Sequence, residues 1–107
     1  MRIAVASSNG DMVDLHLGKA KSLAIYDVVD DKFNFVETRN VELDENAKHQ
    51  GGDVIQKCSD CDVIIAEQYG FKSKIKAGDA GIKLVSDNGP VKEVLQRYLN
   101  HYNFMNS

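Results

Sequence analysis

A single histidine near the N-terminus has the surroundings of a metal ligand. His16 belongs to the segment DLHLGK, where Asp14 precedes it by two residues and Gly18 follows it by two. Neutral imidazole is a good ligand for iron and other transition metals, and a nearby carboxylate can orient the ring or bind the metal itself. Glycine lets backbone and a bulky ligand approach closely. The spacing is compatible with a metal or cofactor site, although a surface histidine beside a turn-forming aspartate is the commoner interpretation of such a pattern.

Positive charge and small polar residues flank this histidine. Lys19 and Lys21 follow it where a short helical turn is expected, and free N–H groups with ammonium groups would favour an anion there. The backbone amides of Ser8, Asn9 and Gly10 could likewise cradle a phosphate or sulfide. Solvated loop lysines are again the commoner interpretation. The glycine patterns of phosphate-binding P-loops and dinucleotide sites are absent.

The segment CSDC places Cys58 and Cys61 at a spacing used by zinc sites and by thiol redox pairs. A redox pair needs its thiolate at the start of a helix, whereas these cysteines end a predicted helix and lead into a predicted strand. A closed zinc site needs four ligands, so His16 and His49 would both have to converge on the pair. We expect Cys58 to be a core residue and Cys61 to begin a buried strand, with Cys58 and His49 as further candidate ligands.

The sequence lacks the combinations of catalytic residues that hydrolytic enzymes use. Two-metal nucleases need carboxylates at neighbouring strand ends, but the first predicted strand has none and Glu67 stands alone at the end of its strand. Ser7 and Ser8 lack a recognisable base in a matching nucleophile elbow. We therefore expect a protein that is not an enzyme.

Composition narrows the class of protein further. The chain has 107 residues, 43% of them hydrophobic and 27% charged, with a formal net charge of −3, which predicts a single globular domain over residues 1–107. Lys and Arg are scattered, so we expect no nucleic-acid partner. No apolar run is long enough to span a membrane, and nothing marks export. A cytoplasmic protein with free thiols is expected.

Hydrophobic periodicity predicts five strands and three helices. The strands fall at residues 2–7, 22–29, 33–41, 62–67 and 82–86. One helix follows the double glycine at 51–52 and ends near residue 60, a second covers 70–81, and a third follows Pro90. The third helix has the clearest apolar stripe, formed by Val91, Val94, Leu95, Tyr98, Leu99 and Tyr102.

This order of elements predicts an α/β fold. Strands two and three form an antiparallel hairpin, and the later strand–helix–strand units require right-handed parallel crossovers. We expect a mixed five-stranded sheet in the order 3-2-1-4-5 with one antiparallel strand and helices on both faces. Ligands of open α/β sheets bind beyond the carboxyl ends of the strands. The loop at 8–18 and the turn at 67–70 should therefore face each other.

With these segments in view, the chain resembles the dinitrogenase iron-molybdenum cofactor-binding family, which comprises small carrier proteins of nitrogenase cofactor assembly and their archaeal and bacterial relatives. The resemblance is carried by RIAVASSNG, VDLHLGKAKSLAIYDV, AKHQGG, DCDVIIAEQYG and AGIKLV. The second segment is similar to the family pattern V-D-x-H-F-G-x-A-x-x-F-x-I-Y-D-V and is the most specific.

The resemblance implies a three-layer, ribonuclease H-like fold without the nuclease carboxylates. It also implies a non-catalytic carrier of the iron-molybdenum cofactor or a precursor iron–sulfur cluster, which is not expected to be retained on purification. The family histidine proposed to hold the cluster falls on His16. In this interpretation amides of residues 8–10 and the ammonium groups of Lys19 and Lys21 receive the anionic cluster, and proteins that donate or accept the cluster are the implied partners.

Two departures and two alternatives accompany this resemblance. Leu17 and Leu23 stand where the family usually has Phe, which would remove aromatic walls from the site, and His49 matches a family position without an assigned role. A small phosphate- or nucleotide-binding α/β enzyme using the loop at 8–21 is one alternative. The other is a zinc-stapled interaction module built on the two cysteines and a histidine.

Overall fold

The computed structural model describes residues 1–44 and 50–106. Strands and helices follow one another as β1 (Arg2–Ala6), β2 (Met12–Val13), the 3₁₀ turn η1 (Leu17–Lys19), β3 (Ser22–Val29), β4 (Lys32–Asn40), α1 (Gly51–Lys57), β5 (Val63–Ala66), α2 (Phe71–Asp79), β6 (Lys83–Ser86), β7 (Gly89–Pro90) and α3 (Val91–Met105). Within the described residues, every helix is too short or too polar to cross a lipid bilayer.

The main sheet has five strands in the order β4-β3-β1-β5-β6, which confirms the predicted order and the α/β class. Strand β3 pairs antiparallel with both β1 and β4, whereas β1, β5 and β6 run parallel to one another. The β3–β4 turn consists of Asp30 and Asp31, both with positive φ. Two such residues form the tight turn whose twist matches that of the flanking strands.

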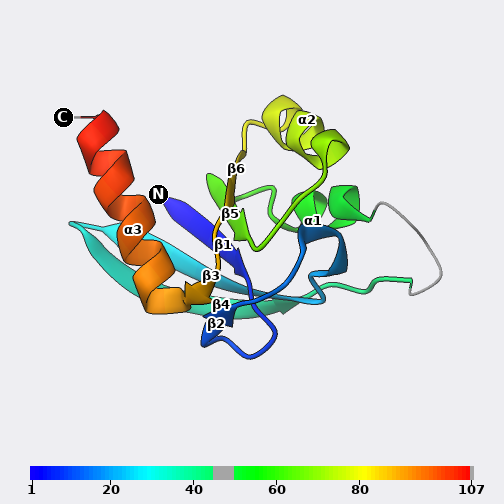
Figure 1. Ribbon diagram of the computed structural model, residues 1–107, viewed down its shortest axis with the longest axis horizontal. Coiled ribbons are helices and arrows are strands. Elements are labelled where there is room, and N and C mark those ends of the chain that lie inside the picture. Colours follow the sequence, from blue (N-terminus) through cyan, green and yellow to red (C-terminus); the bar gives the residue numbers. More distant parts are fainter. Residues whose placement is uncertain (45–49, 107) are drawn as a thin grey trace.

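Helices cover both faces of this sheet (Figure 1). Because side chains alternate along a strand, Ile3 and Val5 of β1 pack in one buried cluster with α3, while Ala4 and Ala6 pack in the other with α1 and α2. Each fully buried aliphatic side chain contributes roughly 1.5–3 kcal/mol of transfer free energy. These two clusters produce the expected three layers and hold the ends of the strands in place.

The carboxyl ends of β1 and β5 bring two loops together, as predicted. The backbone N–H of Leu17 donates to the carbonyl of Gln68 at 2.8 Å, and that of Glu67 donates to the carbonyl of Leu15 at 3.0 Å. These bonds join the loop after β1 to the turn after β5. The segment that carries the candidate histidine is therefore fixed to the centre of the sheet.

Two local features differ from the sequence prediction. A small second sheet pairs β2 with β7, and two-residue strands have no periodicity by which a sequence could reveal them. Helix α1 begins at Gly51 and includes the double glycine instead of following it. The reason is packing, because a Cβ at Gly51 would lie 2.1 Å from Oγ of Ser73 in α2. Only glycine allows α1 to approach α2 this closely.

Candidate functional site

A cavity of about 810 Å³ opens beside the loop that follows β1. Its walls come from four parts of the chain: η1 with its flanking residues, the segment after β4, the start of α1, and α2 with the residue before it. The described lining residues are His16, Gly18, Lys19, Lys21, Leu43, Asp44, Gln50, Gly51, Gly70, Phe71, Lys72, Ser73 and Lys76. Four of the residues that the sequence analysis proposed for the cofactor, His16, Gly18, Lys19 and Lys21, thus line one cavity.

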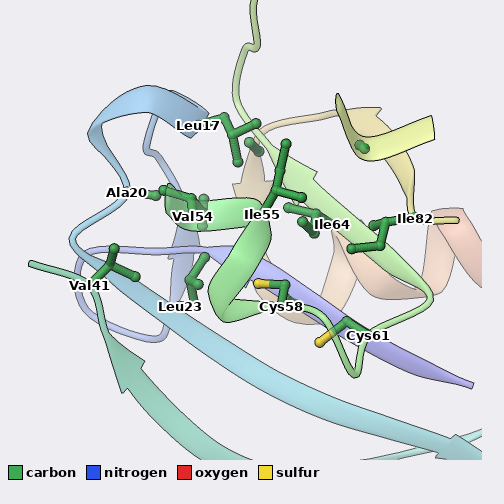
Figure 2. Close-up of a cluster of buried hydrophobic side chains, with 14 of the residues drawn as sticks. Leu17, Ala20, Leu23, Val41, Val54, Ile55, Cys58, Cys61, Ile64 and Ile82 are labelled. Carbon is green, nitrogen blue, oxygen red and sulfur yellow. The ribbon is translucent and has the colours of Figure 1, made fainter. Parts of the chain in front are cut away.

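Leu17 anchors the loop that presents the histidine. Its side chain is fully buried in the cluster that includes Val54 and Ile55 of α1 (Figure 2). With Leu17 directed into the core, its neighbours His16 and Gly18 line the cavity. The expected loss of an aromatic wall does not follow, because Leu17 and the equally buried Leu23 are core residues and do not line the cavity.

The imidazole of His16 is exposed and also caps η1. Its Nδ1 accepts a hydrogen bond of 3.1 Å from the backbone N–H of Gly18, and its carbonyl accepts one of 2.9 Å from the N–H of Lys19. The first bond replaces an intrahelical partner that the start of the turn lacks. His16 therefore has a structural contact of its own at the edge of the cavity.

Positive charge dominates the cavity although the whole chain is acidic. Four lysines line it, Lys19, Lys21, Lys72 and Lys76, against one carboxylate, Asp44, among the described lining residues. The formal net charge of the chain is −3. A concave, positively charged surface on an acidic protein concentrates anions locally, so this arrangement suits an anionic ligand.

The serine-rich turn after β1 lies outside the cavity lining. The N–H and Oγ of Ser8 both donate to the carboxylate of Asp14, and the N–H of Gly10 donates to Oγ of Ser7. The Oδ1 of Asn9 accepts hydrogen bonds from the backbone N–H groups of Asp11 and Met12. The structure therefore does not bring Ser8, Asn9, Gly10 or Asp14 to the cavity with His16, because their polar groups satisfy one another within the loop.

The two cysteines occupy the core, as expected. Cys58 is fully buried at the end of α1 and Cys61 is 5% exposed just before β5 (Figure 2). A hydrogen bond to Cys61 and burial both raise the pKa of the Cys58 thiol, which keeps it protonated. Neither cysteine lines the cavity.

Among the described residues, no three His, Cys, Asp or Glu side chains are grouped as a metal site would require. His49 lies outside the described residues.

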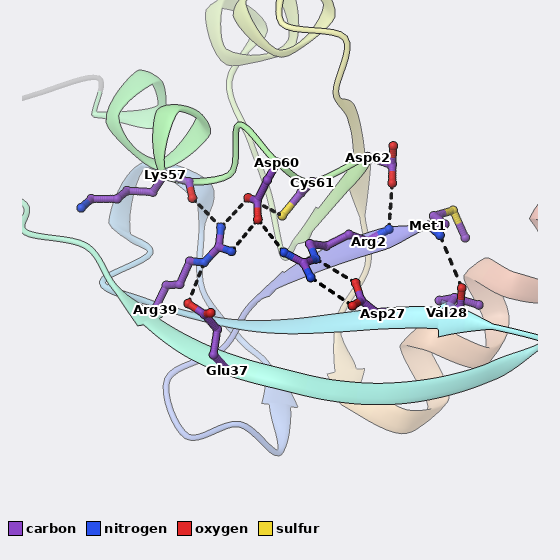
Figure 3. A network of polar contacts seen from close by, with 10 residues as sticks. All are labelled: Met1, Arg2, Asp27, Val28, Glu37, Arg39, Lys57, Asp60, Cys61 and Asp62. Atoms are coloured by element: carbon purple, nitrogen blue, oxygen red, sulfur yellow. Dashed lines mark hydrogen bonds and ion pairs between the residues drawn. The ribbon is translucent and has the colours of Figure 1, made fainter.

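An ion-pair network holds the far end of α1. Arg39 of β4 binds Asp60 through both terminal nitrogens, at 2.6 and 2.7 Å, and donates to the carbonyl of Lys57 at 2.8 Å. Arg2 of β1 binds the same Asp60 at 2.7 Å and also binds Asp27 (Figure 3). The Arg39 guanidinium, aided by Arg2, holds the pKa of the Asp60 carboxyl well below its usual range. The network thus fixes the segment between α1 and β5 at the end of α1 opposite the cavity.

Sequence reasoning missed the contribution of α2. Lys72, Ser73 and Lys76 line the cavity from this helix, and Gly51 meets Ser73 where the two helices touch. The sequence did contain a signal for the two lysines. Residues four apart on a helix share a face, and a helix that follows strand β5 begins near the carboxyl end of the sheet, where ligands bind. Which face of α2 would turn toward the cavity could not be read from its weakly apolar sequence.

Comparison with known proteins relates most of the chain to one family. A model of the family described as dinitrogenase iron-molybdenum cofactor matches residues 1–101. The chain is also 30% identical over 107 residues to protein NifX of Sinorhizobium fredii strain NBRC 101917 / NGR234, a match that covers 91% of this chain and 67% of that protein.

Three solved structures are similar in fold. The protein PH0822 superposes with a TM-score of 0.80 at 19% identity, over 94% of this chain and 90% of that one. A Methanocaldococcus jannaschii protein provisionally described as a dinitrogenase gives 0.68 at 18% identity, over 94% and 89%. A Thermotoga protein provisionally described as a NifB protein gives 0.64 at 22% identity, over 92% and 87%. At these identities the likeness concerns the fold alone.

Proposed function

Because the chain belongs to the dinitrogenase iron-molybdenum cofactor family, we propose that it is a non-catalytic carrier that binds the iron-molybdenum cofactor, or an iron–sulfur precursor of it, as cargo. The observation that carries the proposal is the cavity of about 810 Å³, which combines the exposed imidazole of His16 with four lysines. Pockets for small molecules and cofactors commonly have volumes of about 300–1,000 Å³. The cavity has room for such a cargo.

The chemistry of the lining matches a cluster that arrives already assembled. His16 offers one nitrogen ligand to an iron or molybdenum atom, and the ammonium groups of the lysines offset the negative charge of a sulfide-rich cluster. Neither Cys58 nor Cys61 lines the cavity. Sites that keep an iron–sulfur cluster permanently use four cysteine thiolates, whereas one imidazole with diffuse positive charge allows release. A carrier of this kind acts between a protein that supplies the cluster and one that receives it.

A cavity without paired carboxylates supports binding in preference to hydrolysis. Asp44 is the one carboxylate among the described lining residues, whereas two-metal hydrolysis needs a shared set of acidic ligands. The lining instead offers groups that attract and hold an anion. We therefore assign the site to binding and transfer of an intact cargo.

The test is anaerobic uptake of isolated cofactor by the purified chain, measured as molybdenum and iron retained after desalting. We expect the wild-type chain to retain cofactor and His16→Ala to retain much less. His101→Ala provides the matched control, because His101 is exposed on α3 and does not line this cavity. Equal retention by the two variants would remove His16 from the site, and no retention by the wild-type chain would refute the carrier function.

The same lysines could also bind phosphate, which keeps a phosphate- or nucleotide-binding enzyme as a second candidate. A ligand that binds only the folded chain raises the thermal midpoint of the chain, and above its Kd the stabilisation grows with the logarithm of the ligand concentration. Stabilisation of this form by a nucleotide, together with turnover of that nucleotide, would favour the enzyme over the carrier.

A further inference from the structure

Helix α2 brings a pair of ammonium groups to the cavity. Lys72 and Lys76 lie about one turn apart on the helix, so they share a face, and both line the cavity. Lys74 lies between them in sequence but projects from the other side of the helix and is not part of the lining. The fold thus selects two of three closely spaced lysines for the cavity.

Lys76 extends from α2 toward α1. Its Nζ lies 3.1 Å from the position that a Cβ of Gly52 would occupy, so the ammonium group rests on the first turn of α1. The side chain therefore has a defined place at the junction of the two helices, beside the contact between Ser73 and Gly51. The side chain is exposed to solvent and also lines the cavity.

The charge of Lys72 does not serve the stability of α2, whereas Lys76 lies in the last turn of that helix, where a cation is favourable. Lys72 is the second residue of α2, and the first turn of that helix contains no acidic residue. The amide groups at a helix start carry partial positive charge, so a cation there is unfavourable. Across residues 1–44 and 50–106, neither Lys72 nor Lys76 forms an ion pair. Local charge placed against stability is typical of a functional site.

We propose that Lys72 and Lys76 form an anion subsite, separate from His16, that binds a small multivalent oxyanion. The inference rests on the proposed function, because it names the part of the cargo that α2 recognises: the metal end meets His16 and an anionic end meets the two lysines. Two ammonium groups one turn apart can contact two oxygens of one ligand. The subsite therefore favours a polycarboxylate or pyrophosphate over a monovalent anion.

The subsite can be tested without any cluster. Citrate, pyrophosphate and acetate are titrated calorimetrically into the full-length chain at low ionic strength. We expect citrate or pyrophosphate to bind, acetate to bind much more weakly, and added salt to weaken the binding. Lys72→Gln and Lys76→Gln should each weaken it about three- to tenfold. Lys74→Gln makes the same change of charge in the same helix and should leave it unchanged.

The outcomes separate this subsite from the proposed carrier function. His16→Ala should lose cluster uptake and keep its affinity for citrate or pyrophosphate. A wild-type chain that takes up cluster but binds neither anion would overturn the subsite and leave the carrier function standing. A wild-type chain that binds citrate or pyrophosphate but takes up no cluster would overturn the carrier function and leave the anion subsite standing. Equal weakening by Lys74→Gln and Lys72→Gln would overturn the subsite, because it would reduce the effect to net charge.

Discussion

The backbone N–H of Gly18 donates a hydrogen bond of 3.1 Å to Nδ1 of His16. A neutral imidazole has one N–H and one acceptor nitrogen, so this bond places the ring proton on Nε2. A metal that binds Nε2 needs that proton to move to Nδ1, where it would oppose the N–H of Gly18. A metal that binds Nδ1 displaces the N–H directly. If His16 holds the proposed cargo, binding through either nitrogen would break this contact, which would lower the affinity and assist release.

The tautomer of His16 is a direct prediction of this geometry. In the chain without cargo, nitrogen-15 NMR of the ring should show the neutral form protonated on Nε2, with Nδ1 as the unprotonated nitrogen. His101, exposed on α3, gives an internal reference in the same spectrum. A His16 ring protonated on Nδ1 would contradict the hydrogen bond from Gly18.

His16→Asn separates the capping role of His16 from its role as a ligand. Asparagine is a good helix-capping residue, so it can accept a hydrogen bond from the start of η1, but it lacks the imidazole nitrogen. We expect its stability to urea to match the wild-type chain within about 0.5 kcal/mol, while His16→Ala loses about 0.5–2 kcal/mol of capping. Cofactor uptake should fall in both variants. Wild-type uptake by His16→Asn would show that the histidine only caps the turn.

Gly51→Ala should disturb the junction on which the cavity is built. The added Cβ would lie 2.1 Å from Oγ and 3.2 Å from Cβ of Ser73, so the serine side chain must rotate or the helices must move apart, at a cost of about 1–3 kcal/mol in the free energy of unfolding measured in urea. Gly78→Ala is the matched control, because nothing lies within 4 Å of the position that an added Cβ would occupy, and alanine favours the helix by roughly 1 kcal/mol relative to glycine. Adding Ser73→Ala to Gly51→Ala should recover part of the loss. Equal effects at Gly51 and Gly78 would contradict the close contact.

Much of the fold could be predicted from local patterns. The strand order followed from two rules, that a short polar turn joins antiparallel strands and that parallel crossovers are right-handed. The hairpin turn at Asp30 and Asp31 falls between the strands predicted at 22–29 and 33–41, and five of the six residues in the predicted apolar stripe of α3 are buried, Tyr102 being the exception. These features depend on residues that are neighbours in sequence or on one helix face.

The site was less predictable because it depends on contacts between distant segments. The position of His16 beside a cavity followed from the place of its loop at the carboxyl ends of the strands. The amides of Ser8 and Gly10 looked available, but the carboxylate of Asp14 and the hydroxyl of Ser7 accept their hydrogen bonds. Whether such a group is already satisfied depends on loop geometry, which a list of residue types does not contain.

Cys58→Ala should leave cofactor uptake unchanged. The thiol of Cys58 is fully buried in the core and does not line the cavity, so its loss removes packing and no ligand. We expect a loss of about 1 kcal/mol in the free energy of unfolding, as for small deletions in a core. The measurement is metal retained per folded chain, with circular dichroism as the check on folding. Reduced uptake by the folded variant would restore Cys58 as a candidate ligand.

Acid should lower the free energy of unfolding of the chain through protonation of Asp60. The guanidinium groups of Arg39 and Arg2 lower the pKa of this carboxyl in the folded chain, so its stabilising contribution is complete above the ordinary value of 3.8 and is lost as the pH falls below it. Asp60→Asn should therefore cost about 1 kcal/mol at neutral pH, a modest figure because the side chain is 42% exposed.

The difference between Asp60→Asn and the wild-type chain should shrink as the pH falls from 3.8 toward about 2, because the Asp60 carboxyl takes up a proton in the unfolded chain while the two arginines keep it ionised in the folded chain. Urea unfolding at several pH values measures both free energies. Asp11→Asn makes the same change at a carboxylate that forms no ion pair with the described residues, and it should show a smaller cost at neutral pH. A cost for Asp60→Asn that stayed constant down to pH 2 would mean that packing, and not the two arginines, makes Asp60 stabilising.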